Sequence, residues 1–573
     1  MRVLGVTGPK HDAAAALFVD GELVAAAEEE RFTRVKHALR QPARESVRYV
    51  LDAAGLAPDD VDAVAYPWSE AAWRAYRGGH LARTWRTDGV TAVRGWWKTI
   101  RRFRRLRARV RGALDAVGVP WARRPWHEIP HHDAHAASAF LLSGFEACAV
   151  LTVDGLGEHV TTQVASYEDG RFAVTHREVM PHSLGCFYSA MTEYLGWRFN
   201  DGEYKLMGMA PYGDAARVDL EGIAGLDASG AFRMDPRAVW VAHHRRVGGK
   251  VFGRPLVERL GEPRQGDGLE APYPDIAAAT QALFERAVLA LVDGPLAAPL
   301  ARTRRLAYAG GCALNVALNR RLVAHPAIER LYVPPAAHDA GTAVGAAAWV
   351  AWQAGDTVRP WTSAALGPAF DDAAIEAALT ARGLAAPRVD DVVATTADLL
   401  ATGHVVGWFQ GRMEMGPRAL GQRSILAHPA VPGMSDRVNR AVKHRETWRP
   451  FCPTLKAEAA RAVLGSDHPA PHMTIAFDVE SAWRERIPQV VHVDGTCRPQ
   501  VVEAGALPRL HALLTAFEAR TGLPVLMNTS LNRRGEPIAA TPDDALTLWD
   551  DGGLDVLVLG ERVLRRAGVP AGR

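Results

Sequence analysis

Two stretches of this chain share one layout, and this repetition restricts the possible fold more than any other feature of the sequence. Residues 2–30 and 147–179 each begin with a short apolar strand, which leads into a polar loop that contains glycine, "TGPKHD" in the first stretch and "DGLGEH" in the second. Each continues with a strand, an Asp-Gly turn at residues 20–21 or 169–170, and a further strand. Asp-Gly between alternating apolar residues is a strong hairpin signal. Two such units about 145 residues apart predict a duplicated α/β domain.

The length and the composition predict a globular protein of at least two domains. The chain has 573 residues, which exceeds what one hydrophobic core normally serves. A net charge of +3 does not demand a nucleic-acid partner. Five cysteines without a C-x-x-C pair argue against a zinc ribbon or a disulfide framework. With neither a signal peptide nor a long apolar run, we expect a cytoplasmic protein without a membrane partner.

A change in composition marks the predicted domain boundary. Pro360 and the Gly-Pro pair at 367–368 interrupt the chain between two segments of regular apolar pattern. Such residues are typical of linkers. We therefore expect a first domain over 1–355 and a second domain over 366–573.

A histidine pair raises the question of a metal site. His131 and His135 stand four residues apart in "HHDAHAASAF", so a helix would place both rings on one face. Asp154 and Asp339 each follow a predicted strand, where an acidic side chain can serve as a ligand. Two imidazoles with two carboxylates suit iron, zinc or manganese better than calcium. The spacing alone favours an ordinary pair on a helix surface or in a core.

Glycine-rich turns predict anion sites in both domains. In the first, "YAGGCALN" reads as a strand, a turn at Gly310 and Gly311, and a helix that starts near Asn315, and such a helix N-terminus attracts anions. A tight turn without a ligand is the alternative. In the second, glycines 411, 416 and 421 alternate with arginines 412, 418 and 423. The flanking aromatic residues indicate burial, which favours an anion pocket over a salt-bridged surface.

One strongly basic segment stands apart from these motifs. Over residues 98–114, apolar residues recur at helical spacing between arginines. The pattern predicts a helix with one packed face and one solvated arginine face. A surface for an anionic or polar partner is the alternative.

The motifs together resemble a known family. "HHDAHAASAF", "VDGLGE", "GGCALN" and "HDAGTAVGAA" occur here in the order seen in the NodU/CmcH family of O-carbamoyltransferases, and the similarity extends to members of antibiotic pathways such as that of tobramycin. The resemblance implies a first domain like that of actin, sugar kinases and heat-shock chaperone ATPases (the ASKHA fold), and a second, YrdC-like domain that forms a carbamoyl adenylate. It further implies that a divalent metal, Fe²⁺ before Zn²⁺ or Mn²⁺, is bound by His131, His135 and Asp339, together with Asp154.

The same resemblance implies a reaction and roles for individual residues. Carbamoyl phosphate and ATP with Mg²⁺ would give carbamoyl-AMP, and the carbamoyl group would pass to a hydroxyl of a small molecule. His11 would take the proton of that hydroxyl, and Lys36 would steady the carbamoyl oxygen. The nucleotide would be held in the first domain by Lys205, Gly208, Gly310, Gly311 and Asn315. Carbamoyl phosphate and ATP would be held in the second by Arg418, Arg423, Ser424, Lys443, Arg449, Arg498, Asn528 and Ser530.

Two other functions are compatible with parts of the sequence. A small-molecule kinase of the sugar-kinase superfamily would need only the duplicated domain. A carbamoyl enzyme of tRNA modification, or an RNA-binding module, would expose a broader basic surface than the near-neutral charge indicates. An Ala- and Arg-rich composition favours an antibiotic as the acceptor, and Trp68 and Trp73 are candidates for its binding site. The particular acceptor and the oligomeric state are left open.

Overall fold

A computed structural model describes residues 1–239 and 249–569 of the chain. These residues form two compact units. The first unit comprises Met1–Val24 and Leu39–Trp361, and the second comprises Ala25–Ala38 and the chain from Thr362 onward. The division therefore falls within the expected linker, but residues 25–38 cluster with the second unit although they lie within the predicted first domain.

Contacts over a long sequence distance hold residues 25–38 in the second unit. The guanidinium group of Arg31, only 2% exposed, donates to the carbonyl oxygen of Gly416 at 2.7 Å and is paired with Glu28. Arg34 donates to the carbonyl oxygens of Pro537 and Ile538 at 2.9 and 2.7 Å. The sequence shows these arginines but not their partners, which lie hundreds of residues away.

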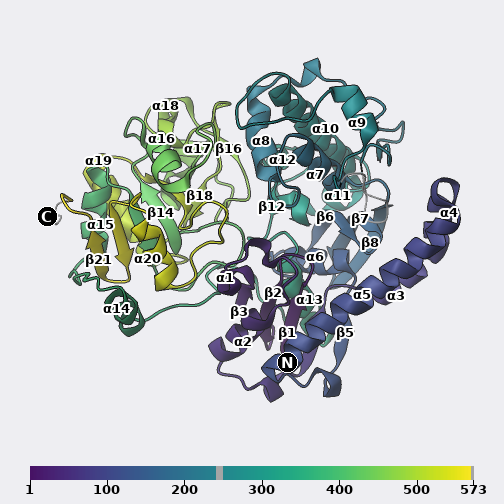
Figure 1. Ribbon diagram of the computed structural model, residues 1–573, viewed down its shortest axis with the longest axis horizontal. Coiled ribbons are helices and arrows are strands. Elements are labelled where there is room, and N and C mark those ends of the chain that lie inside the picture. Colours follow the sequence, from purple (N-terminus) through teal and green to yellow (C-terminus); the bar gives the residue numbers. More distant parts are fainter. Residues whose placement is uncertain (240–248, 570–573) are drawn as a thin grey trace. The chain divides into compact units, whose positions relative to one another are not determined.

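The first unit contains two five-stranded sheets with one common strand order, which confirms the predicted duplicated domain (Figure 1). In each half the first strand pairs antiparallel with the second and parallel with a later strand. The first sheet has the order β3-β2-β1-β4-β5, with strands Glu22–Glu28, Ala14–Val19, Arg2–Thr7, Ala63–Tyr66 and Trp126–Glu128. The second has the order β8-β7-β6-β11-β12, with strands Arg171–Val179, Val160–Glu168, Cys148–Gly157, Arg305–Ala309 and Arg330–Tyr332.

Two small-residue helices pack between these sheets. Helix α6 (His131–Phe140) contacts β6 and β11, and helix α13 (Gly341–Gln353) contacts β1, β2 and α6. Their contact is close because a Cβ atom on Gly345 would lie 1.9 Å from the carbonyl oxygen of Ala134. This approach fixes the position of α6, which carries the histidine pair.

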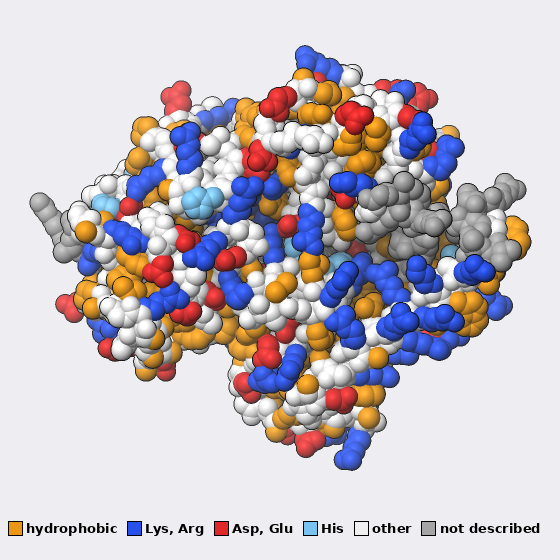
Figure 2. All heavy atoms as spheres, in the orientation of Figure 1, with side chains coloured by type: hydrophobic (Ala, Val, Ile, Leu, Met, Phe, Trp, Pro, Cys, Tyr) orange, Lys and Arg blue, Asp and Glu red, His pale blue; other side chains and the backbone are white. Residues whose placement is uncertain are grey.

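Helix α5 (Val90–Val117) contains the predicted basic helix and follows α3 (Glu70–Ala75) and α4 (Arg77–Asp88). Ile100, Val110 and Leu114 are buried on its packed side. Lysine and arginine side chains gather on the region of α5 that faces the viewer in Figure 2. Within the described residues, no helix is both long and apolar enough to cross a membrane.

The second unit is built on a seven-stranded mixed sheet, in agreement with the predicted α/β class. Helix α15 (Val392–Ala401) packs against α19 (Pro508–Thr521), and α20 (Pro542–Asp550) contacts β13 and β20. The strand order is β18-β15-β19-β14-β13-β20-β21, with strands Gln500–Val502, Cys452–Lys456, Val525–Ser530, Arg423–Ala427, Val406–Phe409, Val556–Leu559 and Arg562–Arg565.

We expect two helical glycines of the first unit to respond oppositely to alanine. Gly345→Ala should lower the free energy of unfolding by about 1–3 kcal/mol, because the new methyl group meets the Ala134 carbonyl oxygen. Gly112→Ala on α5 should raise it by about 0.5–1 kcal/mol, because its Cβ would meet nothing within 4 Å and alanine favours a helix. Urea unfolding of both variants checks this, and equal effects would contradict the packing of α13 on α6.

Candidate metal centre

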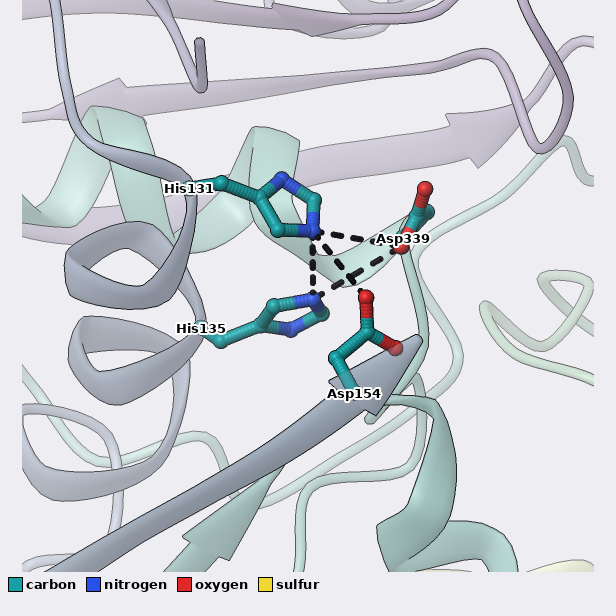
Figure 3. A group of neighbouring side chains, drawn as sticks. All are labelled: His131, His135, Asp154 and Asp339. Carbon is teal, nitrogen blue, oxygen red and sulfur yellow. Dashed lines mark hydrogen bonds and ion pairs between the residues drawn. The ribbon is translucent and has the colours of Figure 1, made fainter. Parts of the chain in front are cut away.

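Two imidazole rings on α6 meet at their Nε2 atoms. His131 and His135 are fully buried, and their Nε2 atoms lie 3.1 Å apart (Figure 3). The i, i+4 spacing brings both rings to one side of the helix. The prediction that the two residues share a face is therefore confirmed.

Two carboxylates close the group from other elements. Asp154 comes from β6, where the register with β7 shifts between Val153 and Gly157, and Asp339 lies in the loop before α13. The Nε2 atom of His131 is 3.4 Å from Oδ2 of Asp154 and 3.5 Å from Oδ1 of Asp339. The Nε2 atom of His135 is 3.6 Å from the same Asp339 oxygen.

The four ligand atoms are spaced to fit one divalent ion. They all lie within 4.8 Å of one another, and ligands bound at about 2.1 Å around a single ion are separated by roughly 3–3.5 Å. The Nδ1 atom of His131 lies 3.3 Å from the carbonyl oxygen of Pro67. This contact assigns the N–H to Nδ1 and leaves the Nε2 lone pair for a metal. The backbone N–H of Gly311 donates to Oδ1 of Asp154 at 2.9 Å, which orients that carboxylate.

The charges of the group also suit a cation. Burial by itself would lower the pKa of His131, but the negative charges of Asp339 and Asp154 outweigh it and raise that pKa to about 10. Burial acts to raise the pKa of Asp339, yet the positive charge of His131 holds it well below its usual value. Without a metal, a proton on His131 thus takes the place of a cation between the two carboxylates.

A buried carboxylate that the sequence analysis missed supports this geometry. Glu158 accepts N–H bonds from the backbone of Ser69 at 2.7 Å and of His131 at 3.2 Å, at the start of α6. Burial raises the pKa of Glu158 to about 7. Trp68, next to Ser69, stacks on the His131 ring at 4.3 Å. In the sequence, Glu158 is an acidic residue in a loop that contains glycine. Nothing in the neighbouring residues indicates that its side chain is buried.

The two tryptophans proposed for acceptor binding differ in the structure. Trp68 is half-buried beside His131, whereas Trp73 is fully buried and stacks on Trp96 at 4.8 Å. Trp73 is therefore a core residue and does not line a binding site. Helical spacing at the start of α3 could have indicated this role.

His11 lies beside the metal candidates, and Lys36 belongs to the other unit. The Nδ1 atom of His11 is 2.8 Å from Oδ2 of Asp12 and 3.7 Å from Oδ2 of Asp339. Lys36 belongs to residues 25–38 of the second unit, where its charge acts on Lys443. The role of Lys36 on the carbamoyl oxygen therefore stays a prediction.

The predicted nucleotide residues lie in three places of the first unit. Gly310 and Gly311 form the turn that contacts Asp154, and Lys205 and Gly208 lie on α8 (Glu203–Met209). The side chain of Asn315 caps helix α12 (Val316–Val323) and forms an amide pair with Gln281. Both polar side-chain atoms of Asn315 are engaged in these bonds. Its contribution to the fold is therefore enough to account for an asparagine at this position.

A cluster of cations surrounds Lys443 in the second unit. Its Nζ donates to the carbonyl oxygens of Ser530 and Asn532 at 2.9 and 3.0 Å, and it lies 3.3 Å from Oγ of Ser530. Burial lowers the pKa of Lys443 well below its usual value, and the positive charges of Arg445, Arg449 and Lys36 lower it further. Such crowding of like charges is relieved when an anion binds.

Other residues predicted for this pocket are engaged in the fold. Arg423 is fully buried, with its guanidinium 3.6 Å from the centre of the Phe409 ring. It donates to the carbonyl oxygens of Gln410, Pro368 and Gly411. Backbone carbonyls and an aromatic face thus replace the anion that the sequence argument required. Ser424 accepts from the N–H of Gly421 and is also fully buried.

The remaining predicted residues lie on strands of the same sheet or in loops next to them. Arg498 directs Nε and Nη2 at the sulfur of Cys452, at 3.2 and 3.0 Å. Asn528 is buried on β19, and its Nδ2 lies 3.3 Å from Oε1 of Gln500. Arg418 is half-buried in the loop between β13 and β14. Of the predicted set, Lys443 contacts Ser530 directly, and the charge of Arg449 acts on Lys443.

We expect binding of Zn²⁺ at the histidine pair to release a proton. Since the pKa of His131 is raised to about 10, the ring is protonated at neutral pH and must lose that proton to bind a metal. Calorimetry in buffers of different ionisation enthalpy should show about one proton released per ion, with weaker affinity as the pH falls. His135→Ala should lose this binding, and His176→Ala on β8 should keep it. An affinity independent of pH would contradict the assignment.

Two family models match most of the chain. Residues 2–348 match the model described as carbamoyltransferase N-terminus, and residues 397–566 match carbamoyltransferase C-terminus. An uncharacterized protein of Synechocystis sp. is 36% identical over 99% of this chain and 97% of its own length. Nodulation protein NolNO of Sinorhizobium fredii is 35% identical over 97% of this chain and 79% of its own.

Similarity to solved structures is weaker. Full-length HypF in its phosphate- and nucleotide-bound form is 13% identical, with a TM-score of 0.33, over 62% of this chain and 56% of that one.

A further relative by sequence is nodulation protein NolO of Bradyrhizobium diazoefficiens, which is 36% identical over 76% of this chain and 78% of its own. With both family models matched in order and relatives of this identity over most of its length, the chain belongs to the carbamoyltransferase family and is a carbamoyltransferase enzyme.

Proposed function

We propose that this enzyme is an ATP-dependent O-carbamoyltransferase that modifies a hydroxyl group of a small secondary metabolite, such as an antibiotic. The observation that carries the proposal is the convergence of two imidazoles and two carboxylates beside His11. The cations around Lys443 support a second site, which would bind anions. A kinase of the sugar-kinase type would need no such second site.

In the second unit, the cations would hold carbamoyl phosphate and ATP. Water releases phosphate from carbamoyl phosphate, and an oxygen of the resulting carbamate attacks the α-phosphorus of ATP. Pyrophosphate leaves, and carbamoyl-AMP forms. Lys443 and Arg449 would offset the negative charge that builds on the phosphoryl oxygens, which is most of what such a transfer requires.

In the first unit, His131, His135, Asp154 and Asp339 would hold a divalent metal. Iron(II), zinc and manganese all suit this set of nitrogen and oxygen ligands. A bound metal of this kind supplies a positive charge for the adenylate phosphate. The turn at Gly310 and Gly311, which contacts Asp154, would lie next to that phosphate.

His11 would act as the general base on the acceptor. Its Nδ1 lies 2.8 Å from the Asp12 carboxylate, which assigns the N–H to Nδ1 and leaves the Nε2 lone pair to accept a proton. As His11 removes the hydroxyl proton, the acceptor oxygen attacks the carbamoyl carbon, and AMP leaves with the electrons of the broken C–O bond. A hydroxyl group is a poor nucleophile at neutral pH without such a base.

We expect His11→Ala to separate the two half-reactions. Transfer to the acceptor should fall by about 10²–10⁴-fold, because the general base is lost. Pyrophosphate release from ATP and carbamoyl phosphate should continue, since His11 belongs to the first unit. A coupled phosphate assay and mass spectrometry of the acceptor measure the two steps, and His176→Ala serves as the control. Equal loss of both steps would reject the assignment.

Arg449→Ala should have the opposite effect. Loss of this cation should slow pyrophosphate release by about 10²–10³-fold, because it leaves the developing phosphoryl charge uncompensated. Arg461→Ala, which removes an exposed arginine of the same unit, should leave the rate unchanged. Normal pyrophosphate release in the Arg449 variant would show that the adenylation site lies elsewhere.

A further inference from the structure

Helix α5 carries a row of cations that the proposed reaction does not use. Arg94, Lys98, Arg101 and Arg105 are all exposed. Their spacing of three or four residues places them along one line of the helix, opposite the buried Ile100 and Val110. Figure 2 shows lysine and arginine side chains crowded on this region. The four cations make no ion pair or hydrogen bond with any part of the chain that the structure describes.

Neighbouring arginines of the same helix are paired, so the row is not simply a salt-bridged face. Arg104 and Arg107 both bind the carboxylate of Glu70, and Arg107 also binds Glu128. These ion pairs attach helix α5 to the rest of the first unit. The row of four cations is left with its positive charge uncompensated.

Large apolar side chains flank this row. Trp97 is 52% exposed and Val93 38%, and they lie one turn apart on α5. Trp85 on α4, which packs against α5, is 55% exposed. Among the described residues, Trp85 and Trp97 are the large aromatic side chains with such exposure. Half of the exposed large apolar residues in the described chain thus lie on this one corner.

We propose that this surface, formed by Trp85, Val93, Trp97 and the row Arg94, Lys98, Arg101 and Arg105, binds the face of an anionic lipid bilayer. We call it the α5 ridge. Tryptophan is favoured at the level of lipid head groups, where its ring meets acyl chains and its N–H meets water. Basic side chains on the same helix attract anionic head groups. The helix lies on the surface and does not cross it.

The charge distribution favours lipid over a nucleic acid. The whole chain has 67 basic and 64 acidic residues. Because these charges nearly balance, a strongly positive surface is confined to local clusters such as this row. A single straight row of four cations with exposed tryptophans beside it matches a flat anionic surface. Nucleic acid binding usually needs a broader basic footprint.

Sedimentation with vesicles tests the proposal on the full chain. We expect binding to vesicles of phosphatidylcholine with phosphatidylglycerol, little binding to phosphatidylcholine alone, and weaker binding as salt is added. Arg101→Gln with Arg105→Gln should weaken binding about 25-fold, since each lost cation contributes about fivefold near an anionic surface. Trp97→Ala should weaken it about tenfold, through loss of apolar burial, while the salt dependence stays the same.

The matched control removes two exposed arginines from other elements. Arg171→Gln with Arg286→Gln makes the same change in net charge, and its binding should equal that of the unmodified chain. Circular dichroism checks that each variant is folded. Three results would overturn the proposal: no binding to anionic vesicles, an equal loss in the control, or unchanged vesicle binding in the α5 variants. Binding of duplex DNA or an acidic protein in place of vesicles would assign the ridge to that other partner.

Discussion

The mutual approach of two imidazoles and two carboxylates in a buried place is the interaction on which the rest of the first unit depends. Three constraints bring the four groups together: a helical repeat for His131 and His135, a shifted strand register for Asp154, and the loop before α13 for Asp339. Burial of such a group is unfavourable unless opposite charges compensate each other. The charge balance therefore requires either a proton on His131 or a cation between the ligands.

In the second unit, positively charged side chains lie close together. There, the positive charges of Lys36, Arg445 and Arg449 act on Lys443, and Arg449 also pairs with the carboxylate of Glu446. One unit thus concentrates groups that attract a cation, and the other concentrates groups that attract an anion. This contrast fits the division of an adenylation reaction and a transfer reaction between two sites.

Local patterns predicted the duplicated fold and the shared helix face of His131 and His135. The Asp-Gly hairpins predicted the duplicated sheets, and the four-residue spacing predicted that His131 and His135 share a face, because both depend on neighbours in the sequence. Partners at long sequence distance could not be predicted in this way. Arg423 looked like an anion ligand because a buried arginine needs a partner, but carbonyl oxygens and the Phe409 ring fill that need. Trp73 was a candidate for acceptor binding, yet it is fully buried against Trp96.

The placement of residues 25–38 has a consequence for biosynthesis. This segment leaves the ribosome early, yet Arg31 donates to Gly416 and Arg34 to Ile538, which are made several hundred residues later. Until then, Arg31 and Arg34 lack these acceptors. The second unit therefore cannot be completed before the C-terminal half of the chain is made. If residues 1–361 were expressed alone, residues 25–38 would be exposed, and Arg31 and Arg34 would lack these acceptors.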